Sequence, residues 1–271
     1  MNRTSLTALV GVSAAAAGVL LWGNTAITTT EHSVFHRAVP RPFDGFRIAH
    51  ITDFHNTAFG KDHHRLLTKL QEAKPDIIAI TGDMIDARRT DIPTALGFAA
   101  EAVKLAPCYY VMGNHEARIP SYPEFEEGLR KVGVHVLRNE SVQLEREGEY
   151  LTVIGIDDPS ASDCFAEDII RMRKEARGFT LLLSHRPERF ETYCAAGVHL
   201  ALCGHAHGGQ VRIPFLGGVI APHQGFFPKY DSGVYKKGDT RMILSRGLGN
   251  SLCPLRVNNR PELIVAELCC E

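Results

Sequence analysis

Five short apolar runs of strand length each end within two residues of a side chain that can bind a metal ion. The runs lie at 46–52, 76–81, 109–112, 180–184 and 198–203, and the polar residues after them are Asp53, Asp83, Asn114, His185 and His205. Helical patterns at 62–74, 92–105, 166–176 and 187–195 lie between these runs, and a further apolar run lies at 150–156. Strands that alternate with helices predict an α/β fold. Because ligands gather at the carboxyl ends of the strands in such sheets, we expect the five polar residues to converge.

The composition is that of an ordinary globular protein, and it excludes some functions. Hydrophobic residues make up 44% of the 271 residues and charged residues 23%, which allows a sizeable core and argues against disorder. The net charge of -1 gives no general attraction for polyanions, so nucleic acid is not expected as a partner. The seven cysteines include no CxxC pair, so neither a disulfide framework nor a structural zinc site is expected.

The N-terminal residues are a candidate membrane segment. No charged residue occurs from Thr4 to Thr30, and the run approaches the roughly 20 residues that span a bilayer. We expect a signal anchor or transmembrane helix at 1–30, because the run lacks a clear small-residue cleavage site. The alternatives are a cleaved export signal and a buried soluble helix. Arg3 on the cytoplasmic side predicts a single anchor in the cell membrane with an extracytoplasmic catalytic domain, although the cysteine usage leans toward a reducing side.

The rest of the chain divides into two parts. A linker is expected at 31–45, which contains Pro40 and Pro42. A single catalytic domain is expected at 46–271, since one α/β domain accounts for this length.

The polar residues fall in five motifs, which are Asp53-Phe54-His55, Gly82-Asp83-Met84-Ile85-Asp86, Gly113-Asn114-His115-Glu116, Ser184-His185 and Gly204-His205-Ala206-His207. Each motif alone is weak, because a Gly-Asp pair is usually a turn and a single His after a strand is usually structural. In this order and spacing, the set resembles the signature of the calcineurin-like metallophosphoesterases over about residues 46–268. The resemblance implies a four-layer α/β/β/α sandwich and a metal-dependent phosphoesterase. Glycine before a ligand is expected where a Cβ would obstruct the turn.

The resemblance also implies a role for each motif residue. One metal ion is assigned Asp53, His55 and His207, the other is assigned Asn114, His185 and His205, and Asp83 lies between the two. His115 matches the family's catalytic histidine, which protonates the leaving alkoxide. Asp86 is expected to hold that ring, with a solvated turn residue as the alternative. Such donors suit two divalent ions of manganese, iron or zinc, which neutralise a phosphoryl group and activate water.

Three later segments, at 208–212, 224–230 and 245–249, resemble membrane-associated bacterial phosphodiesterases, some of which hydrolyse UDP-2,3-diacylglucosamine. The expected reaction is hydrolysis of phosphate esters or pyrophosphate bonds at the membrane, through a dinuclear metal site. The expected substrate is a phosphate-containing small molecule or a lipid-linked one. The alternatives are a phosphomonoesterase or protein phosphatase, and a non-catalytic, metal-stabilised membrane binding module, which would be expected to have lost a ligand or His115.

Two aromatic residues carry a hypothesis about a lipid-linked substrate. Phe226 and Phe227 are expected to dip toward the bilayer while Lys229, Arg246 or Arg256 meets a phosphate. The alternative is that the Phe residues pack in the core and the Arg residues lie on the solvated surface.

Overall fold

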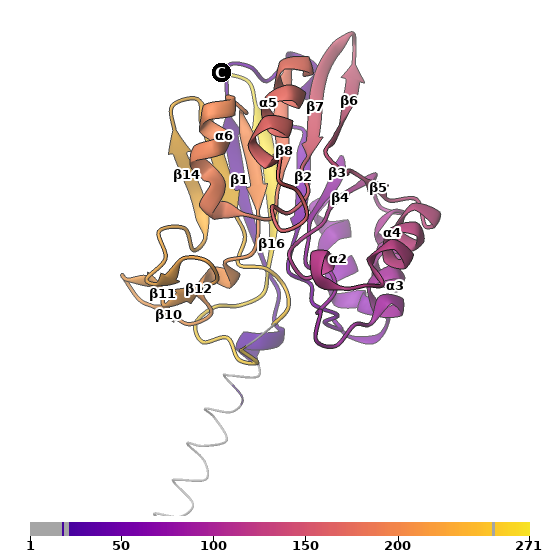
Figure 1. The fold of residues 1–271 in the computed structure, drawn as a ribbon, viewed down its shortest axis with the longest axis vertical. Coiled ribbons are helices and arrows are strands. Elements are labelled where there is room, and N and C mark those ends of the chain that lie inside the picture. The colour runs from indigo at the N-terminus through magenta and orange to yellow at the C-terminus, as the bar shows by residue number, and fades with distance from the viewer. Residues whose placement is uncertain (1–17, 19–21, 251–252) are drawn as a thin grey trace, which may run out of the picture.

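The computed structural model describes residues 18, 22–250 and 253–271, and its centre is a pair of six-stranded sheets (Figure 1). The first sheet, in spatial order, consists of β1 (Thr28–Phe35), β16 (Glu262–Cys269), β2 (Arg47–Ile51), β3 (Ile77–Thr81), β4 (Cys108–Val111) and β5 (His135–Val136). The second consists of β14 (Gly233–Lys237), β15 (Thr240–Leu244), β9 (Leu200–Cys203), β8 (Phe179–Leu183), β7 (Glu149–Gly155) and β6 (Glu140–Arg146). The runs β2–β3–β4–β5 and β15–β9–β8–β7 are parallel.

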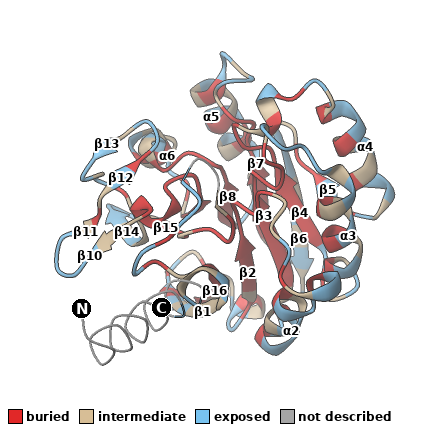
Figure 2. Cartoon of the chain, turned by 90° about the horizontal axis from the view of Figure 1, so that it is seen from below, coloured by how far each residue is buried: buried red, intermediate tan, exposed pale blue. Residues whose placement is uncertain are grey.

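Helices cover the outer face of each sheet. The first sheet carries α2 (His64–Ala73), α3 (Ile92–Ala102) and α4 (Tyr122–Lys131), and the second carries α5 (Phe165–Glu175) and α6 (Phe190–Ala196). Figure 2 shows the central strands buried between these layers, whereas the helices expose their outer faces. The layer order is therefore the predicted α/β/β/α.

Alternation along the strands explains why both faces of a sheet are buried. In β2, Ala49 and Ile51 pack toward the helices, whereas Ile48 packs toward the second sheet. In β8, Leu182 packs toward α5 and α6, whereas Leu181 faces the first sheet. Strands buried on both faces have continuous apolar sequences, which is the pattern that the sequence shows at these runs.

The predicted linker at 31–45 is wrong, because most of it is built into the domain. β1 pairs in parallel with β16 over its whole length, from Thr28 opposite Glu262 to Phe35 opposite Cys269. A short 3-10 helix, Arg41–Phe43, then places the Phe43 ring in the core. An edge strand buries only part of one face, so β1 lacks the apolar signal of a central strand.

The predicted membrane segment at 1–30 is only partly within the described residues. Its last residues belong to the domain, since β1 begins at Thr28. Residues 1–17 and 19–21, which form the centre of the prediction, lie outside the described part of the chain. Among the residues that are described, no helix is both long enough and apolar enough to cross a membrane.

An arm projects from the domain between β9 and β14, and we define it as residues 212–228. It contains two small hairpins, which consist of β10 (Arg212–Ile213) with β11 (Gly217–Gly218), and of β12 (Ile220–Ala221) with β13 (Gly225–Phe226). Figure 1 shows the arm at the same end of the molecule as the start of the described chain.

Candidate metal centre

The predicted ligands lie on sharp turns at the ends of strands. Five of them have left-handed backbone conformations, with φ of 51° at Asp53, 47° at His55, 52° at Asp83, 71° at His205 and 48° at His207. Residues other than glycine seldom adopt this conformation, and those that do cluster at functional sites. The turns follow β2, β3 and β9 directly, so they bring side chains from both sheets to one place.

Two glycines permit the loops to approach each other closely. A Cβ on Gly113 would collide with the Asp83 carboxylate, and a Cβ on Gly204 would collide with Thr52 and with the Asp53 carboxylate. Neither obstacle is the end of a flexible surface side chain. This agrees with the interpretation of these glycines from the sequence.

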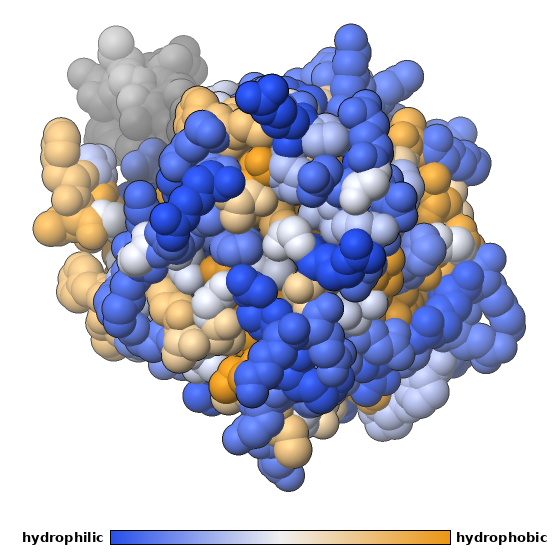
Figure 3. Space-filling model, turned by 90° about the horizontal axis from the view of Figure 1, so that it is seen from above, coloured by the Kyte–Doolittle hydropathy of each residue, from blue (hydrophilic) through white to orange (hydrophobic). Residues whose placement is uncertain are grey.

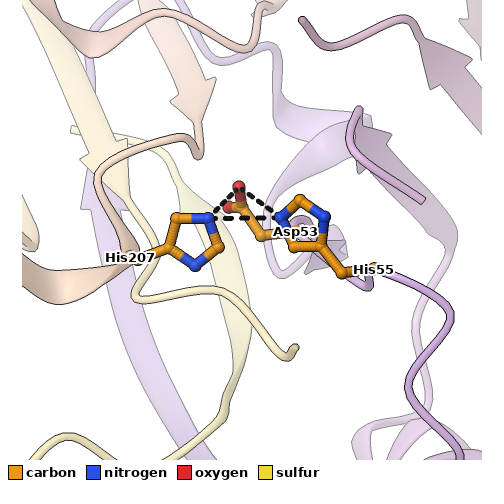
Figure 4. A group of neighbouring side chains, drawn as sticks. All are labelled: Asp53, His55 and His207. Atoms are coloured by element: carbon orange, nitrogen blue, oxygen red, sulfur yellow. Dashed lines mark hydrogen bonds and ion pairs between the residues drawn. The ribbon is translucent and has the colours of Figure 1, made fainter. Parts of the chain in front are cut away.

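The first cluster contains Asp53, His55 and His207, and Figure 4 shows the carboxylate beside the two rings. The Nε2 atoms of His55 and His207 are 3.2 Å apart. Asp53 Oδ1 lies 3.3 Å from His207 Nε2 and 3.9 Å from His55 Nε2. Three donor atoms that converge from β2 and from the loop after β9 can hold one cation.

The second cluster contains Asp83, His185 and His205. His185 Nε2 lies 3.2 Å from Asp83 Oδ2 and 3.2 Å from His205 Nδ1. Asp83 Oδ2 is also 3.7 Å from His55 Nε2, so this carboxylate faces both clusters. The structure therefore brings these predicted site residues together and places the Asp83 carboxylate close to both clusters.

Asn114 lies beside the second cluster and offers a further oxygen donor. Its side chain is buried, and among the described residues its Oδ1 atom has no hydrogen-bond partner. An unsatisfied buried amide oxygen costs free energy, which a bound cation would recover. The imidazole, carboxylate and amide donors therefore fit divalent metal ions.

The electrostatics of the centre also favour bound cations. Burial lowers the pKa values of His55, His205 and His207, which keeps these rings in the neutral form that binds metals. Burial opposes protonation of His185 as well, yet the neighbouring Asp83 and Asp53 carboxylates raise its pKa to about 10. Two buried carboxylates thus attract positive charge, and a metal ion would take the place of that proton.

His185 is oriented by the strand next to it. Its Nδ1 atom lies 2.7 Å from the Thr81 carbonyl oxygen, and a carbonyl can only accept, so Nδ1 carries the proton. Nε2 is then the nitrogen that faces Asp83. Such a backbone contact fixes the tautomer of a metal-binding histidine.

Glu116 is a buried residue to which the sequence motifs assign no role. Its carboxylate accepts hydrogen bonds from the backbone N–H groups of Asp83 (2.8 Å), Ile85 (3.0 Å) and Gly113 (2.9 Å). Burial and the nearby Asp83 raise the pKa of Glu116 to about 7, against the effect of these three donors. Glu116 therefore ties the loop after β3 to the loop after β4. In the sequence, the only indication of this role is the position of Glu116 directly after Asn114 and His115.

His115 lies at the edge of the centre and faces Asp83 with its Nε2 atom, at 3.9 Å. The Ala87 backbone N–H donates to His115 Nδ1 at 2.9 Å. Asp86 Oδ1 is 3.7 Å from the same nitrogen, and Asp86 instead accepts hydrogen bonds from the backbone and guanidinium of Arg88. Asp86 thus shapes the loop that carries Ala87, and the distance from its Oδ1 atom to the His115 ring is too long for a direct hydrogen bond.

A cleft of about 400 Å³ opens over the centre. Its lining includes Asn114, His115 and Arg118, and also Ile220, Pro222 and His223 of the arm. The Arg118 side chain is exposed at this cleft and brings a positive charge. The sequence motifs do not include Arg118 or His223, and only the tertiary structure shows that both line the cleft.

The three basic residues expected near a phosphate have other partners. Arg256 is buried, and its guanidinium donates to the Arg246 and Gly249 carbonyl oxygens at 2.7 and 2.6 Å. The Arg246 guanidinium donates to Glu262 at 2.8 Å, and Lys229 pairs with Glu191 at 3.6 Å. Arg256 therefore stabilises a loop behind His207, and the alternative that placed it on the solvated surface is wrong.

Comparisons with known proteins agree with this geometry. The family model described as calcineurin-like phosphoesterase matches residues 46–209. The Bacillus subtilis metallophosphoesterase YkuE is 33% identical, over 89% of this chain and 85% of that protein, and the Escherichia coli phosphodiesterase YaeI is 30% identical, over 73% and 72%. The Thermus thermophilus sulfate thiohydrolase SoxB shares the fold with a TM-score of 0.53 and 13% identity, over 85% of this chain and 57% of that one.

The matched residues include all five motifs, and their side chains are the ones that meet between the two sheets. Members of this family use divalent metal ions to cleave phosphate esters. The chain therefore belongs to the calcineurin-like phosphoesterases and is a phosphate-ester hydrolase.

Proposed function

We propose that this protein is a phosphodiesterase with a dinuclear metal centre. The observation that carries the proposal is the position of Asp83, whose Oδ2 atom is close to both histidine clusters. Asp53, His55 and His207 would hold one ion, and Asn114, His185 and His205 the other. When bound, two divalent ions supply charge neutralisation for the phosphoryl group and activation of water.

The chain's own residues then orient the ester. Because a backbone N–H can only donate, His115 Nδ1 accepts from Ala87 and the proton of the neutral ring lies on Nε2. Nε2 faces the cleft and can donate to a phosphoryl oxygen. An imidazolium carries N–H at both nitrogens, so proton delivery to the leaving alkoxide from the charged ring would require the Ala87 contact to open.

The cleft favours a diester over a monoester. Beyond the metal centre it continues along Ile220, Ala221 and Pro222, which offer an apolar wall to a second ester group. Arg118 can meet an additional negative charge. The similarity to YaeI, which is named a phosphodiesterase, supports the same choice.

The test compares bis(p-nitrophenyl) phosphate with p-nitrophenyl phosphate, using the full chain in detergent after chelation and readdition of manganese. We expect metal-restored hydrolysis with a preference for the diester and little activity in the His115→Ala variant. A preference for the monoester would assign a phosphomonoesterase or protein phosphatase. No hydrolysis with two metals bound would indicate a metal-stabilised binding module.

We also propose that the protein acts at the cell membrane, with its N-terminal segment as anchor and the domain outside the cytoplasm. The uncharged run from Thr4 to Thr30 and the preceding Arg3 support this orientation. Protease added to intact spheroplasts should degrade the domain. Protection until the membrane is lysed would place the domain in the cytoplasm.

A further inference from the structure

The arm exposes an unusual amount of apolar surface. Phe215 is fully exposed, Leu216 is 69% exposed, and Phe226 and Phe227 are 74% and 62% exposed. The core-packing alternative for Phe226 and Phe227 is therefore wrong. Between Arg212 and Lys229 the sequence contains no Asp, Glu, Lys or Arg. Exposed apolar surface of this kind marks a site of interaction with a partner or a membrane.

The arm is held firmly against the metal centre. Val219 N–H donates to the Gly209 carbonyl at 3.1 Å and to the Val211 carbonyl at 2.8 Å, and Phe227 N–H donates to the Val219 carbonyl at 2.8 Å. A Cβ on Gly209 would collide with the Gly218 backbone, so the two loops touch. Gly209 follows the candidate ligand His207 by two residues. The aromatic tips are thus fixed relative to the metal centre.

The start of the described chain is joined to the base of the arm. The Asn24 side chain accepts from Arg256 N–H at 2.7 Å and donates to the Arg256 carbonyl at 3.1 Å. Arg212 N–H, at the first residue of the arm, donates to the Val257 carbonyl at 3.0 Å. The Arg260 guanidinium lies 4.3 Å from the centre of the exposed Trp22 ring. The segment from Trp22 to Asn24 therefore lies beside the base of the arm.

The rest of the surface offers a contrast. Figure 3 views the molecule from the opposite end, which is mainly hydrophilic, with smaller groups of apolar side chains toward both sides. A bilayer at the other end would meet the arm and the exposed Trp22 together. Aromatic side chains on a surface without charges suit the interface between acyl chains and headgroups.

We propose that the tips of the arm, at Phe215–Leu216 and Phe226–Phe227, insert into the bilayer interface. In this position they hold the cleft over a lipid-linked phosphodiester. The proposal deepens the proposed function and rests on it. Ile220, Pro222 and His223 line the cleft from the same hairpin, so a headgroup phosphate that passes the arm reaches Asn114 and His115.

A fluorescence experiment tests the insertion directly. Trp22 is the single tryptophan, so Trp22→Phe removes the native signal and Phe226→Trp places a reporter on the arm. The full-length double variant is reconstituted in vesicles of phosphatidylethanolamine and phosphatidylglycerol, with or without brominated acyl chains. We expect a blue-shifted emission that the bromines quench. The matched control carries Trp22→Phe with Ile170→Trp, on the exposed face of α5, and should show neither effect.

Two results would overturn the proposal. If the protein is bound to the vesicles but the emission of the Phe226→Trp reporter is neither blue-shifted nor quenched, the tips of the arm stay in water. A blue shift that depends on protein concentration and is insensitive to bromine would assign the surface to a second copy of the chain.

An activity experiment separates this proposal from the proposed function. Phe226→Glu with Phe227→Glu is compared with Phe35→Glu with Ile170→Glu, a pair exposed at other sites. The same proteoliposomes receive soluble bis(p-nitrophenyl) phosphate or contain a diacylglycerol p-nitrophenyl phosphodiester in the bilayer. We expect the arm variant to lose about tenfold on the bilayer substrate, and to keep its rate on the soluble one. An arm variant that keeps the rate of the unaltered protein on the bilayer substrate would refute the arm's role. Absence of activity in the unaltered protein, on either substrate, would refute the phosphodiesterase itself.

Discussion

At the scale of single residues, the centre combines ligands with side chains that hold them in place. The tautomer of His185 is set by the Thr81 carbonyl, and that of His115 by the Ala87 N–H. Glu116 connects the loop that carries Asp83, after β3, to the loop after β4. Substitution of single residues can therefore distinguish side chains that act on the substrate from side chains that bind the metal ions.

His115→Ala should lower turnover of a phosphodiester by about 100- to 10,000-fold, because it removes the hydrogen-bond or proton donor at the cleft. Metal content should stay near that of the unaltered protein, since the His115 ring is proposed to contact the substrate and not a metal ion. The measurement pairs steady-state rates with metal analysis of the same sample. Loss of metal would show that His115 is a ligand.

Asp83→Asn should remove both metal ions together, because Oδ2 lies 3.7 Å from His55 Nε2 in the first cluster and 3.2 Å from His185 Nε2 in the second. An amide retains the shape of the side chain but loses the negative charge that attracts the cations. Metal analysis after gel filtration measures the outcome. Retention of one ion per chain would contradict the bridging assignment.

Glu116→Gln should destabilise the folded chain by about 1–3 kcal/mol, because an amide nitrogen would face backbone N–H donors in a buried site. Denaturant unfolding measures the change. The control is Glu127→Gln on the exposed surface of α4, which should leave the unfolding midpoint unchanged. An equal effect in both variants would rule out a special role for the buried carboxylate.

At the scale of elements, close packing of the loops decides whether the ligands can meet. The predicted strands at 46–52, 76–81 and 198–203 are confirmed as β2, β3 and β9, with small shifts of their ends. No strand is predicted at β16, at β15 or within the arm. β16 completes the first sheet between β1 and β2, and its partners lie far away along the chain.

Gly204→Ala should abolish metal binding, because the added Cβ would push against Thr52 and the Asp53 carboxylate. The matched control is Gly97→Ala on the exposed side of α3, where a Cβ meets nothing within 4 Å. This control should keep its metals and gain about 0.5–1 kcal/mol in stability, since alanine favours a helix over glycine. Metal analysis and thermal unfolding of both variants provide the comparison, and normal metal content in Gly204→Ala would contradict the packing argument.

At the scale of the whole molecule, the metal centre joins the two sheets. Asp53 and Asp83 come from the first sheet, whereas His185 and His205 come from the second. Ligands that bind only the folded state stabilise it by mass action. The centre should therefore contribute to the stability of the sandwich as a whole.

Chelation should lower the unfolding midpoint, and readdition of manganese should restore it. At a free metal concentration of about 100 times the dissociation constant, the expected gain is about 2.7 kcal/mol for one site. Calorimetry measures the shift. His115→Ala should retain the response and Asp83→Asn should lack it, and an identical midpoint with and without metal would disprove the contribution.

The sequence by itself determined the family, and it predicted the four-layer fold and the candidate residues of the metal centre. It could do so because each candidate ligand lies within four residues of the end of a strand and parallel strands bring their ends together. The uncharged N-terminal run is likewise a property of the sequence, and the membrane proposal rests on it. Only the tertiary structure placed Glu116, Arg118 and His223, and only it showed that Phe226 and Phe227 stay exposed. The physical reason is that contacts between distant loops, and the burial that they produce, have no periodic pattern along the chain.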